Sequence, residues 1–273
     1  IETVASTGGN ITPPIMGLSA FIMCEILGVS YTKVMLWGVV PAILWYYSTF
    51  LFVHFSALRQ DVESWTPERE ELVQVLKSKW HLLISIGVLV FFLVKLRVAE
   101  VAALYSLLSL FVISFFRKET RLNILKLKEF FLSFANTFAG LTLLNTMLGI
   151  FTAGLLSTGT HSKLIHLVFG GISNWFAISL IVFGLCILFG MVVPPFAAYI
   201  AIVTIAAPLL RQAGFELPVI HMFVMYACTL APITPPVAVA AYTAASIAGA
   251  DALKTANEAT IQALPLWIFP FLL

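Results

Sequence analysis

The sequence predicts an all-α integral membrane protein, and three observations lead to that fold class. The chain of 273 residues is 60% hydrophobic and only 10% charged, which excludes an ordinary soluble domain. No Asp, Glu, Lys or Arg occurs from Leu164 to Leu210. This run is long enough for two membrane crossings, because each needs roughly 20 apolar residues. Short segments of alternating hydrophobicity, which are typical of a membrane β-barrel, are absent from the sequence.

The apolar runs and the breaks between them place the expected helices in order. A polar stretch over 57–79 separates the early helices from the later ones, and Thr66-Pro67 within it is a plausible helix start. An amphipathic piece over 161–169 is expected to be an interfacial helix rather than a catalytic or metal site. We expect apolar helices over about 13–28, 33–55, 80–96, 99–116, 130–156, 174–189, 194–210, 218–230 and 237–248, with a further helix near the end.

The loop over 117–128 predicts the orientation in the membrane. It carries Arg117, Lys118, Arg121, Lys126 and Lys128 against the single acid Glu119. Because basic loops remain in the cytoplasm, this loop is predicted to be cytoplasmic. The stretch over 57–79 lies two crossings away and is therefore expected on the same side.

Residue patterns that carry catalysis are absent. The sequence has no H-E-x-x-H and no G-x-S-x-G motif, and no aspartate lies within an expected span. Ser19 and Ser179 have no evident histidine partner. Cys24, Cys186 and Cys228 lie in apolar surroundings without C-x-x-C spacing, so they are predicted to be small packing residues. We therefore expect no enzyme activity, no organic cofactor and no metal site formed by these residues.

The tetrapeptide Ile-Thr-Pro-Pro occurs twice, at Ile11 and at Ile233. In both places an expected helix of similar length follows and reaches a glycine, Gly28 or Gly249. A gap of one residue then aligns Lys33 with Lys254, and a proline interrupts the next apolar run, at Pro41 and at Pro265. These shared features favour an internal duplication.

Each proline pair predicts a broken helix, with a new helix beginning at Pro13 or at Pro235. A proline removes a helical hydrogen bond and pushes the preceding residue away from helical angles. Unwound backbone at membrane depth is tolerated only against protein or a polar cavity, where carbonyls can bind a cation and helix N-termini an anion. Paired broken helices therefore point to a transporter binding site. The polar or flexible residues at the two breaks are Gly8, Gly9, Asn10, Thr12, Thr229 and Thr234.

A third break lies at 189–196, where the sequence reads FGMVVPPF. A glycine followed by two prolines and a helix of small residues suits the tip of a re-entrant helical hairpin. An ordinary tight loop at the surface is the alternative.

These motifs resemble a known family. GGNITPPIMGLSAFIMCEILGVSY, LFGMVVPPFAAYIAIVTIAAPLL and APITPPVAVAAYTAASIAGADALKT are similar to the large membrane subunit of tripartite ATP-independent periplasmic (TRAP) transporters, most of all the fused permeases that work with TAXI-type binding proteins. The resemblance covers nearly the whole chain and is weakest over 57–135. It implies an inverted-repeat secondary transporter of the elevator type, in the cytoplasmic membrane of a bacterium or an archaeon.

The resemblance also implies a function and a set of site residues. A periplasmic substrate-binding protein would deliver a small organic anion, usually a carboxylate, and Na⁺ would be the coupling ion. A small membrane subunit, or its fused equivalent, would be a further partner within the lipid bilayer. Gly9, Asn10, Thr12 and Pro13 would line a first-half ion site, and Gly190, Met191, Thr229, Ala231, Thr234 and Pro235 a second-half site. Asn10 and Thr234 could also face the substrate.

The resemblance divides the chain into three parts: the end of a first repeat over 1–56, connecting scaffold helices over 57–129, and a second repeat over 130–273. We expect the chain to be part of a longer polypeptide whose first-half hairpin precedes residue 1. One departure concerns the hairpin tip, where the family's threonines are replaced by Pro195 and Phe196. Side-chain contacts from this tip are therefore in doubt, while its backbone could still serve.

A channel-like or structural membrane subunit without its own transport cycle is the alternative function. The duplicated breaks count against it, because neither a simple pore nor a structural subunit needs a matched pair of interrupted helices.

Overall fold

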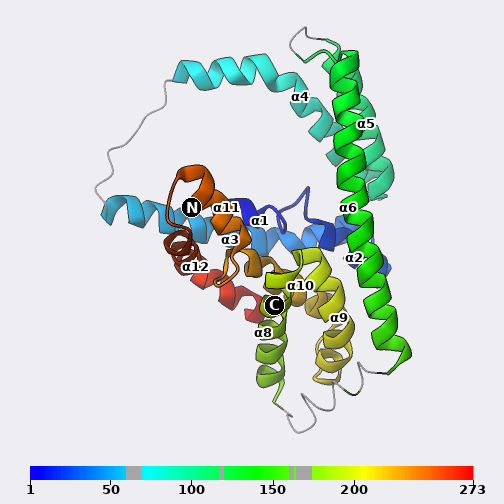
Figure 1. Cartoon of the computed structure of the whole chain (residues 1–273), viewed down its shortest axis with the longest axis vertical. Coiled ribbons are helices and arrows are strands. Elements are labelled where there is room, and N and C mark those ends of the chain that lie inside the picture. Colours follow the sequence, from blue (N-terminus) through cyan, green and yellow to red (C-terminus); the bar gives the residue numbers. More distant parts are fainter. Residues whose placement is uncertain (60–68, 97, 117–119, 160–162, 164–173, 273) are drawn as a thin grey trace. The chain divides into compact units, whose positions relative to one another are not determined.

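The computed structural model describes residues 1–59, 69–96, 98–116, 120–159, 163 and 174–272. Every element in this part of the chain is helical (Figure 1). Four of its helices are long and apolar enough to cross a membrane: Tyr31–Arg59, Lys77–Leu96, Trp175–Val192 and Pro195–Gln212. The predicted all-α membrane class is confirmed at this level. The interfacial piece over 161–169 and the helix start at Thr66-Pro67 lie outside the described residues.

The chain forms two compact units. One comprises residues 1–29, 34–56 and 143–273, and contains all the predicted site residues. The other comprises 30–33 and 57–142. This division follows packing, whereas the predicted domains follow repeats, so those domain boundaries stay a prediction.

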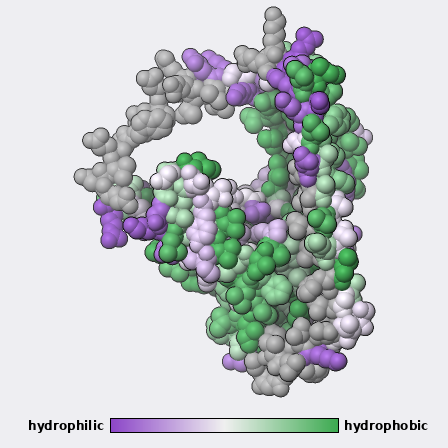
Figure 2. Space-filling view, in the orientation of Figure 1, coloured by the Kyte–Doolittle hydropathy of each residue, from purple (hydrophilic) through white to green (hydrophobic). Residues whose placement is uncertain are grey.

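The first unit is organised around α10 (Leu217–Leu230), in which every residue from Ile220 to Leu230 is buried. Helices α8 (Trp175–Val192) and α9 (Pro195–Gln212) form a hairpin that packs against α10, and α2 (Leu18–Leu27) packs against both α9 and α10 (Figure 1). Asn174 caps α8 by accepting a hydrogen bond from the backbone N–H of Phe176 at 2.9 Å. Hydrophobic side chains cover much of the visible face around α8 in Figure 2, as a lipid-embedded surface requires.

Both helices interrupted by Ile-Thr-Pro-Pro are broken in the structure, but their second halves begin later than predicted. Helix α1 (Glu2–Gly8) is followed by α2, which starts at Leu18 and not at Pro13. Helix α10 continues as the short 3₁₀-helix η1 (Ala231–Ile233), and α11 (Val239–Ala248) starts at Val239 and not at Pro235.

The late starts have a physical cause in how each loop closes. The backbone N–H of Gly17 donates to the carbonyl of Asn10 at 2.7 Å, which closes a loop around the first proline pair. In the second break the N–H of Ala238 donates to the carbonyl of Thr234 at 3.1 Å, with Ala238 in the left-handed region at φ 32°. Because proline has no N–H, each loop closes between residues on either side of the pair. The Pro13–Pro14 and Pro235–Pro236 peptide bonds are both cis.

The helices after the two breaks have equal lengths and end alike. Helices α2 and α11 each contain 10 residues, and each ends at a glycine in the left-handed region, Gly28 at φ 63° and Gly249 at φ 64°. Glycine suits these positions because it adopts positive φ without steric cost. Helices α3 (Tyr31–Arg59) and α12 (Ala252–Ile268) come next, followed by the 3₁₀-helix η2 (Phe269–Leu272). Pro41 and Pro265, the prolines that interrupt the two apolar runs, lie inside α3 and α12.

The second unit is dominated by the packing of α4 (Arg69–Leu96) against α5 (Ala99–Ser114). The hydroxyl of Ser106 on α5 donates to the carbonyl of Ser85 on α4 at 2.9 Å. Helix α6 (Ile124–Ser157) begins six residues earlier than the expected start at Phe130. Asn123 explains the earlier start, because its side chain accepts a hydrogen bond from the N–H of Lys126 at 2.8 Å in the first turn.

Candidate functional site

The fold brings the two breaks together. Helix α1, which ends at the first break, packs against η1, α10, α11 and α12, which surround the second break (Figure 1). The predicted residues over 8–13 and 229–235 therefore lie in one region of the first unit, although more than 200 positions separate them in the chain.

The threonine of each Ile-Thr-Pro-Pro forms the same hydrogen bond. The hydroxyl of Thr12 donates to the carbonyl of Gly8 at 2.6 Å, and the hydroxyl of Thr234 donates to the carbonyl of Leu230 at 2.8 Å. In both cases the acceptor lies four residues earlier. The isoleucines before them, Ile11 and Ile233, are both completely buried. The two breaks thus share their local geometry as well as their sequence.

A second matched threonine precedes each break. Five positions separate Thr7 from Thr12 and Thr229 from Thr234. The hydroxyl of Thr7 donates to the carbonyl of Thr3 at 2.7 Å, and that of Thr229 donates to the carbonyl of Met225 at 2.8 Å. Thr229 was among the predicted site residues, whereas Thr7 was not. The shared spacing T-x-x-x-I-T-P-P was the signal in the sequence that could have identified Thr7.

The four prolines have no N–H to donate to the carbonyls three and four residues earlier, so six carbonyls lose at least one possible helical donor. Four of these carbonyls have another partner. The carbonyl of Asn10 accepts from the N–H of Gly17, that of Gly9 from the N–H of Thr12 at 3.4 Å, and that of Ala231 from the N–H of Thr234 at 3.1 Å. The fourth, that of Ile233, accepts from the hydroxyl of Thr260 on α12 at 3.1 Å.

The two remaining carbonyls belong to Ile11 and Pro232. Within the described residues, neither receives a hydrogen bond. One such carbonyl lies at each break, which is the kind of group that can bind a cation. Thr260 is a functional candidate that no sequence motif marks, because its contact with Ile233 depends on how α12 packs.

The glycines of the first break differ in their surroundings. A Cβ atom at Gly8 would lie 2.5 Å from Nε1 of Trp45, so the indole on α3 fills the space beside this residue. The same Nε1 donates to the carbonyl of Val4 at 3.1 Å. Gly9 and Asn10 are exposed, and Thr12 and Pro13 are half-buried. Gly8 therefore allows helix packing in this structure, while Gly9 and Asn10 are accessible.

The hairpin tip lies against the second break. A Cβ atom at Gly190 would lie 2.6 Å from Cβ of Ala231 and 3.2 Å from the carbonyl oxygen of Cys228. Ala231 is fully buried and Thr234 is 6% exposed, whereas Met191 and Pro235 are half-buried. The structure thus brings Gly190 together with the residues of the second break, and only glycine fits at that contact.

An open pocket of about 390 Å³ lies at this junction. Its walls come from the tip of the α8–α9 hairpin, from the break and from the start of α11. No charged residue lines it, and its polar surface comes from the backbone. The predicted site residues among its walls are Gly190, Met191 and Ala231, together with the neighbouring Pro194, Pro195 and Pro232.

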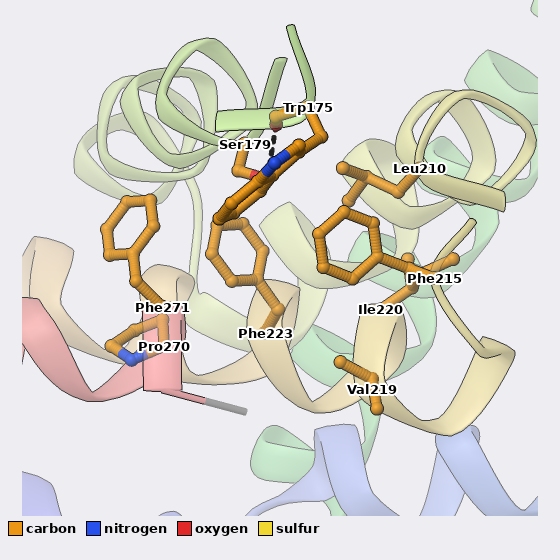
Figure 3. A pocket seen from close by; sticks show the side chains of 9 residues that line it. All are labelled: Trp175, Ser179, Leu210, Phe215, Val219, Ile220, Phe223, Pro270 and Phe271. Atoms are coloured by element: carbon orange, nitrogen blue, oxygen red, sulfur yellow. Dashed lines mark hydrogen bonds between the residues drawn. The ribbon is translucent and has the colours of Figure 1, made fainter. Parts of the chain in front are cut away.

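A second pocket lies at the other end of the hairpin (Figure 3). Aromatic rings surround it, with Trp175, Phe215 and Phe271 around a space of about 30 Å³. That space can hold a water molecule but not an organic anion. The hydroxyl of Ser179 donates to the carbonyl of Trp175 at 2.9 Å, within its own helix. None of the predicted site residues lines this pocket.

Among the described residues, no group of three or more His, Cys, Asp and Glu side chains is arranged to hold a metal ion. The three cysteines form no disulfide, and Cys186 and Cys228 are completely buried. The chemistry of the region is therefore that of carbonyls, hydroxyls and helix ends.

Comparison with known proteins identifies the family of this chain. A search of curated proteins found no significant match. A family model described as "Tripartite ATP-independent periplasmic transporter, DctM component" matches residues 1–273, the whole chain. The transporter motifs at the breaks and the helical membrane fold agree with that match. The chain belongs to the DctM family, the large permease component of TRAP transporters.

Proposed function

We propose that this protein catalyses sodium-coupled uptake of an organic anion by an elevator mechanism. The family implies secondary transport with a periplasmic substrate-binding protein and a small membrane subunit, by a multi-pass protein of the inner membrane. It is a family of transporters and not of enzymes. Sodium as the coupling ion, a carboxylate as the substrate and a fused TAXI-type assembly in a bacterium or an archaeon are our proposals beyond that.

The observation that supports this function best is the matched pair of breaks. Each combines a threonine hydroxyl bonded four residues back with one carbonyl that has no donor among the described residues, at Ile11 and at Pro232. Sodium is a hard cation that prefers neutral and anionic oxygens, and two oxygen-rich breaks would provide two such places. In the proposal, Asn10, Thr12, Thr229 and Thr234 take part through their backbone or side-chain oxygens.

The pocket at the hairpin tip supports an anionic substrate. Helix α9 begins at Pro195 beside the pocket, so the positive end of its dipole faces the space. No acidic residue lines the pocket that would repel an anion. The absence of carboxylates there also argues against a proton relay as the coupling mechanism.

Reconstituted uptake tests the proposal. The permease is placed in liposomes with its small subunit, and a panel of labelled carboxylates is supplied with the binding protein under an inward sodium gradient. We expect accumulation that requires both sodium and the binding protein. Equal uptake in potassium buffer would contradict sodium coupling, and downhill flux without accumulation would favour the channel-like alternative.

A further inference from the structure

A buried tyrosine–histidine pair joins the hairpin to the central helix. The hydroxyl of Tyr199 on α9 lies 2.7 Å from Nδ1 of His221 on α10, a hydrogen bond whose donor depends on the histidine tautomer. The exposed fractions of the two residues are 0% and 2%. Their ring centres lie 6.0 Å apart with the planes tilted by 61°. Both residues lie in helices that the sequence predicts, and no motif assigns a role to either of them.

This bond differs from the other hydroxyl bonds of the same helices. Thr204 on α9 donates to the carbonyl of Ile200, and Thr229 on α10 donates to that of Met225, so both satisfy their own helix. Hydrogen bonds within one helix do not position that helix against its neighbour, whereas a hydrogen bond between two helices does. Polar side chains within a membrane-embedded bundle are costly unless paired, and such pairs mark functional positions.

The tyrosine–histidine pair lies close to the hairpin tip. Tyr199 lies four residues after Pro195, the first residue of α9, which is about 6 Å along the helix axis. The other described side-chain contacts of the hairpin with η1 and α10 are apolar or weakly polar: Gly190 against Ala231, Phe183 against Phe223, and Cys186 beside Cys228, whose thiols form only a weak hydrogen bond. Contacts of this kind allow helices to slide or rotate. The Tyr199–His221 bond is directional and specifies one arrangement.

We propose that Tyr199 and His221 are positioning residues, which hold the hairpin tip in register with the second break. This inference rests on the proposed function, because it assigns the register to the second-half sodium and substrate site. The pair touches neither ligand. It acts by fixing where Gly190 and the start of α9 stand relative to Ala231 and Pro232.

Uptake measurements test the role with a matched control. Tyr199→Phe removes the hydroxyl and is expected to raise the half-saturating sodium concentration about threefold to tenfold, as loss of one bond between membrane helices predicts. The maximal rate should change less than about twofold, since no group that contacts a ligand is lost. Tyr226→Phe is the control: Tyr226 lies on α10, is 3% exposed, and its buried hydroxyl has no hydrogen-bond partner among the described residues. It should behave as wild type.

A second pair of variants separates positioning from packing. His221→Phe removes the bond and should reproduce the effect of Tyr199→Phe. His221→Asn places an amide near the position of Nδ1 and should restore the half-saturating concentration to within about twofold of wild type. If Tyr199→Phe does not fold, the two His221 variants still decide the question.

A distance measurement tests the register without transport. Spin labels at Val192 and Val239 lie on opposite sides of the pocket, and these residues are 83% and 58% exposed. The background is Cys24→Ala, because the buried Cys186 and Cys228 should not label. We expect Tyr199→Phe to broaden the distance distribution, while Tyr226→Phe leaves it unchanged. Identical distributions and sodium responses for these two variants would overturn the inference. Wild-type protein without sodium-driven uptake would instead overturn the proposed function, and the distances would still report on the register.

Discussion

The two breaks have the same internal hydrogen bonds but different surroundings. In the second, the hairpin tip covers Ala231, which is fully buried. In the first, Gly9 occupies the matching position and is exposed, and only the carbonyl of Ser6 lies near a Cβ atom built there, at 3.1 Å. The two copies of T-x-x-x-I-T-P-P thus form the same local break in different surroundings, and tertiary packing decides whether the break is exposed or covered.

Local hydrogen bonds and tertiary packing therefore contribute differently to the two breaks. The local bonds of Thr12 and Thr234 prepare carbonyl and hydroxyl oxygens wherever the motif occurs. The hairpin then packs against Ala231 in the second break and adds a wall of the pocket. Variants that change the contact between the hairpin tip and Ala231 should affect the second break alone. Variants of the matching threonines, Thr12 and Thr234, should have effects of similar size at their respective breaks.

The largest effect is expected from closing the space at Gly190. Gly190→Ala places a Cβ atom 2.6 Å from that of Ala231, so the tip must move away from the break. A displacement of this kind at a binding site lowers rates by about a hundredfold, and we expect a loss of uptake of at least about tenfold.

Gly184→Ala is the matched control for this variant, because it lies on the same helix and a Cβ atom there meets nothing within 4 Å. It should retain uptake and melt at the same or a slightly higher temperature. Equal uptake by the two variants would show that the tip does not need its close contact with Ala231.

The threonines come next in size. Thr234→Val and Thr12→Val keep the shape of the side chain but remove the hydroxyl, and each should raise the half-saturating sodium concentration about threefold to tenfold. Thr243→Val is the control, since its hydroxyl makes the same type of bond, to the carbonyl of Val239, but on α11 outside the break. An unchanged sodium response in Thr234→Val would remove that residue from the site.

A smaller effect is expected from changing Trp45, which packs beside Gly8 in the first break. Trp45→Phe removes the donor to the carbonyl of Val4 and frees part of the space beside Gly8. We expect a loss of about 1 kcal/mol in stability and a rise of about threefold in half-saturating sodium. Thermal unfolding in detergent and uptake measure the two quantities. A variant that unfolds earlier but keeps its sodium response would assign Trp45 to packing alone.

The smallest effect should come from Thr260→Val. Its hydroxyl donates to Ile233 at 3.1 Å and also bonds the carbonyl of Ala256 at 2.9 Å, so the bond to the break is shared. We expect about a twofold rise in half-saturating sodium. A change as large as that of Thr234→Val would mean that the carbonyl of Ile233 contributes more to the second break than this geometry indicates.

Local sequence chemistry predicted the positions of both breaks and of the hairpin tip, because proline and glycine act within a few residues of themselves. It placed the second helical halves too early, since the closing bonds of Gly17 and Ala238 involve residues that the motif does not mark. Gly8, one of the predicted site residues, lies beside the indole of Trp45, a contact that the motif does not mark.

Contacts between distant segments could not be predicted from the sequence. The bond from Thr260 to Ile233 and the pair formed by Tyr199 and His221 depend on helix packing, and no periodic pattern encodes which side chains will meet. Thr7 could have been identified from the sequence, because its spacing to Thr12 repeats at Thr229 and Thr234.

The 10-residue length of α2 and α11 has an electrical consequence. A helix of that length is about 15 Å long, which is half of a hydrocarbon core of about 30 Å. A cation held one such helix below the surface crosses about half of the transmembrane field. Each sodium ion bound there would then gain or lose about 1.2 kcal/mol per 100 mV, so its apparent affinity should change about sevenfold to eightfold with that voltage. The short helices would make the membrane potential itself a determinant of ion occupancy.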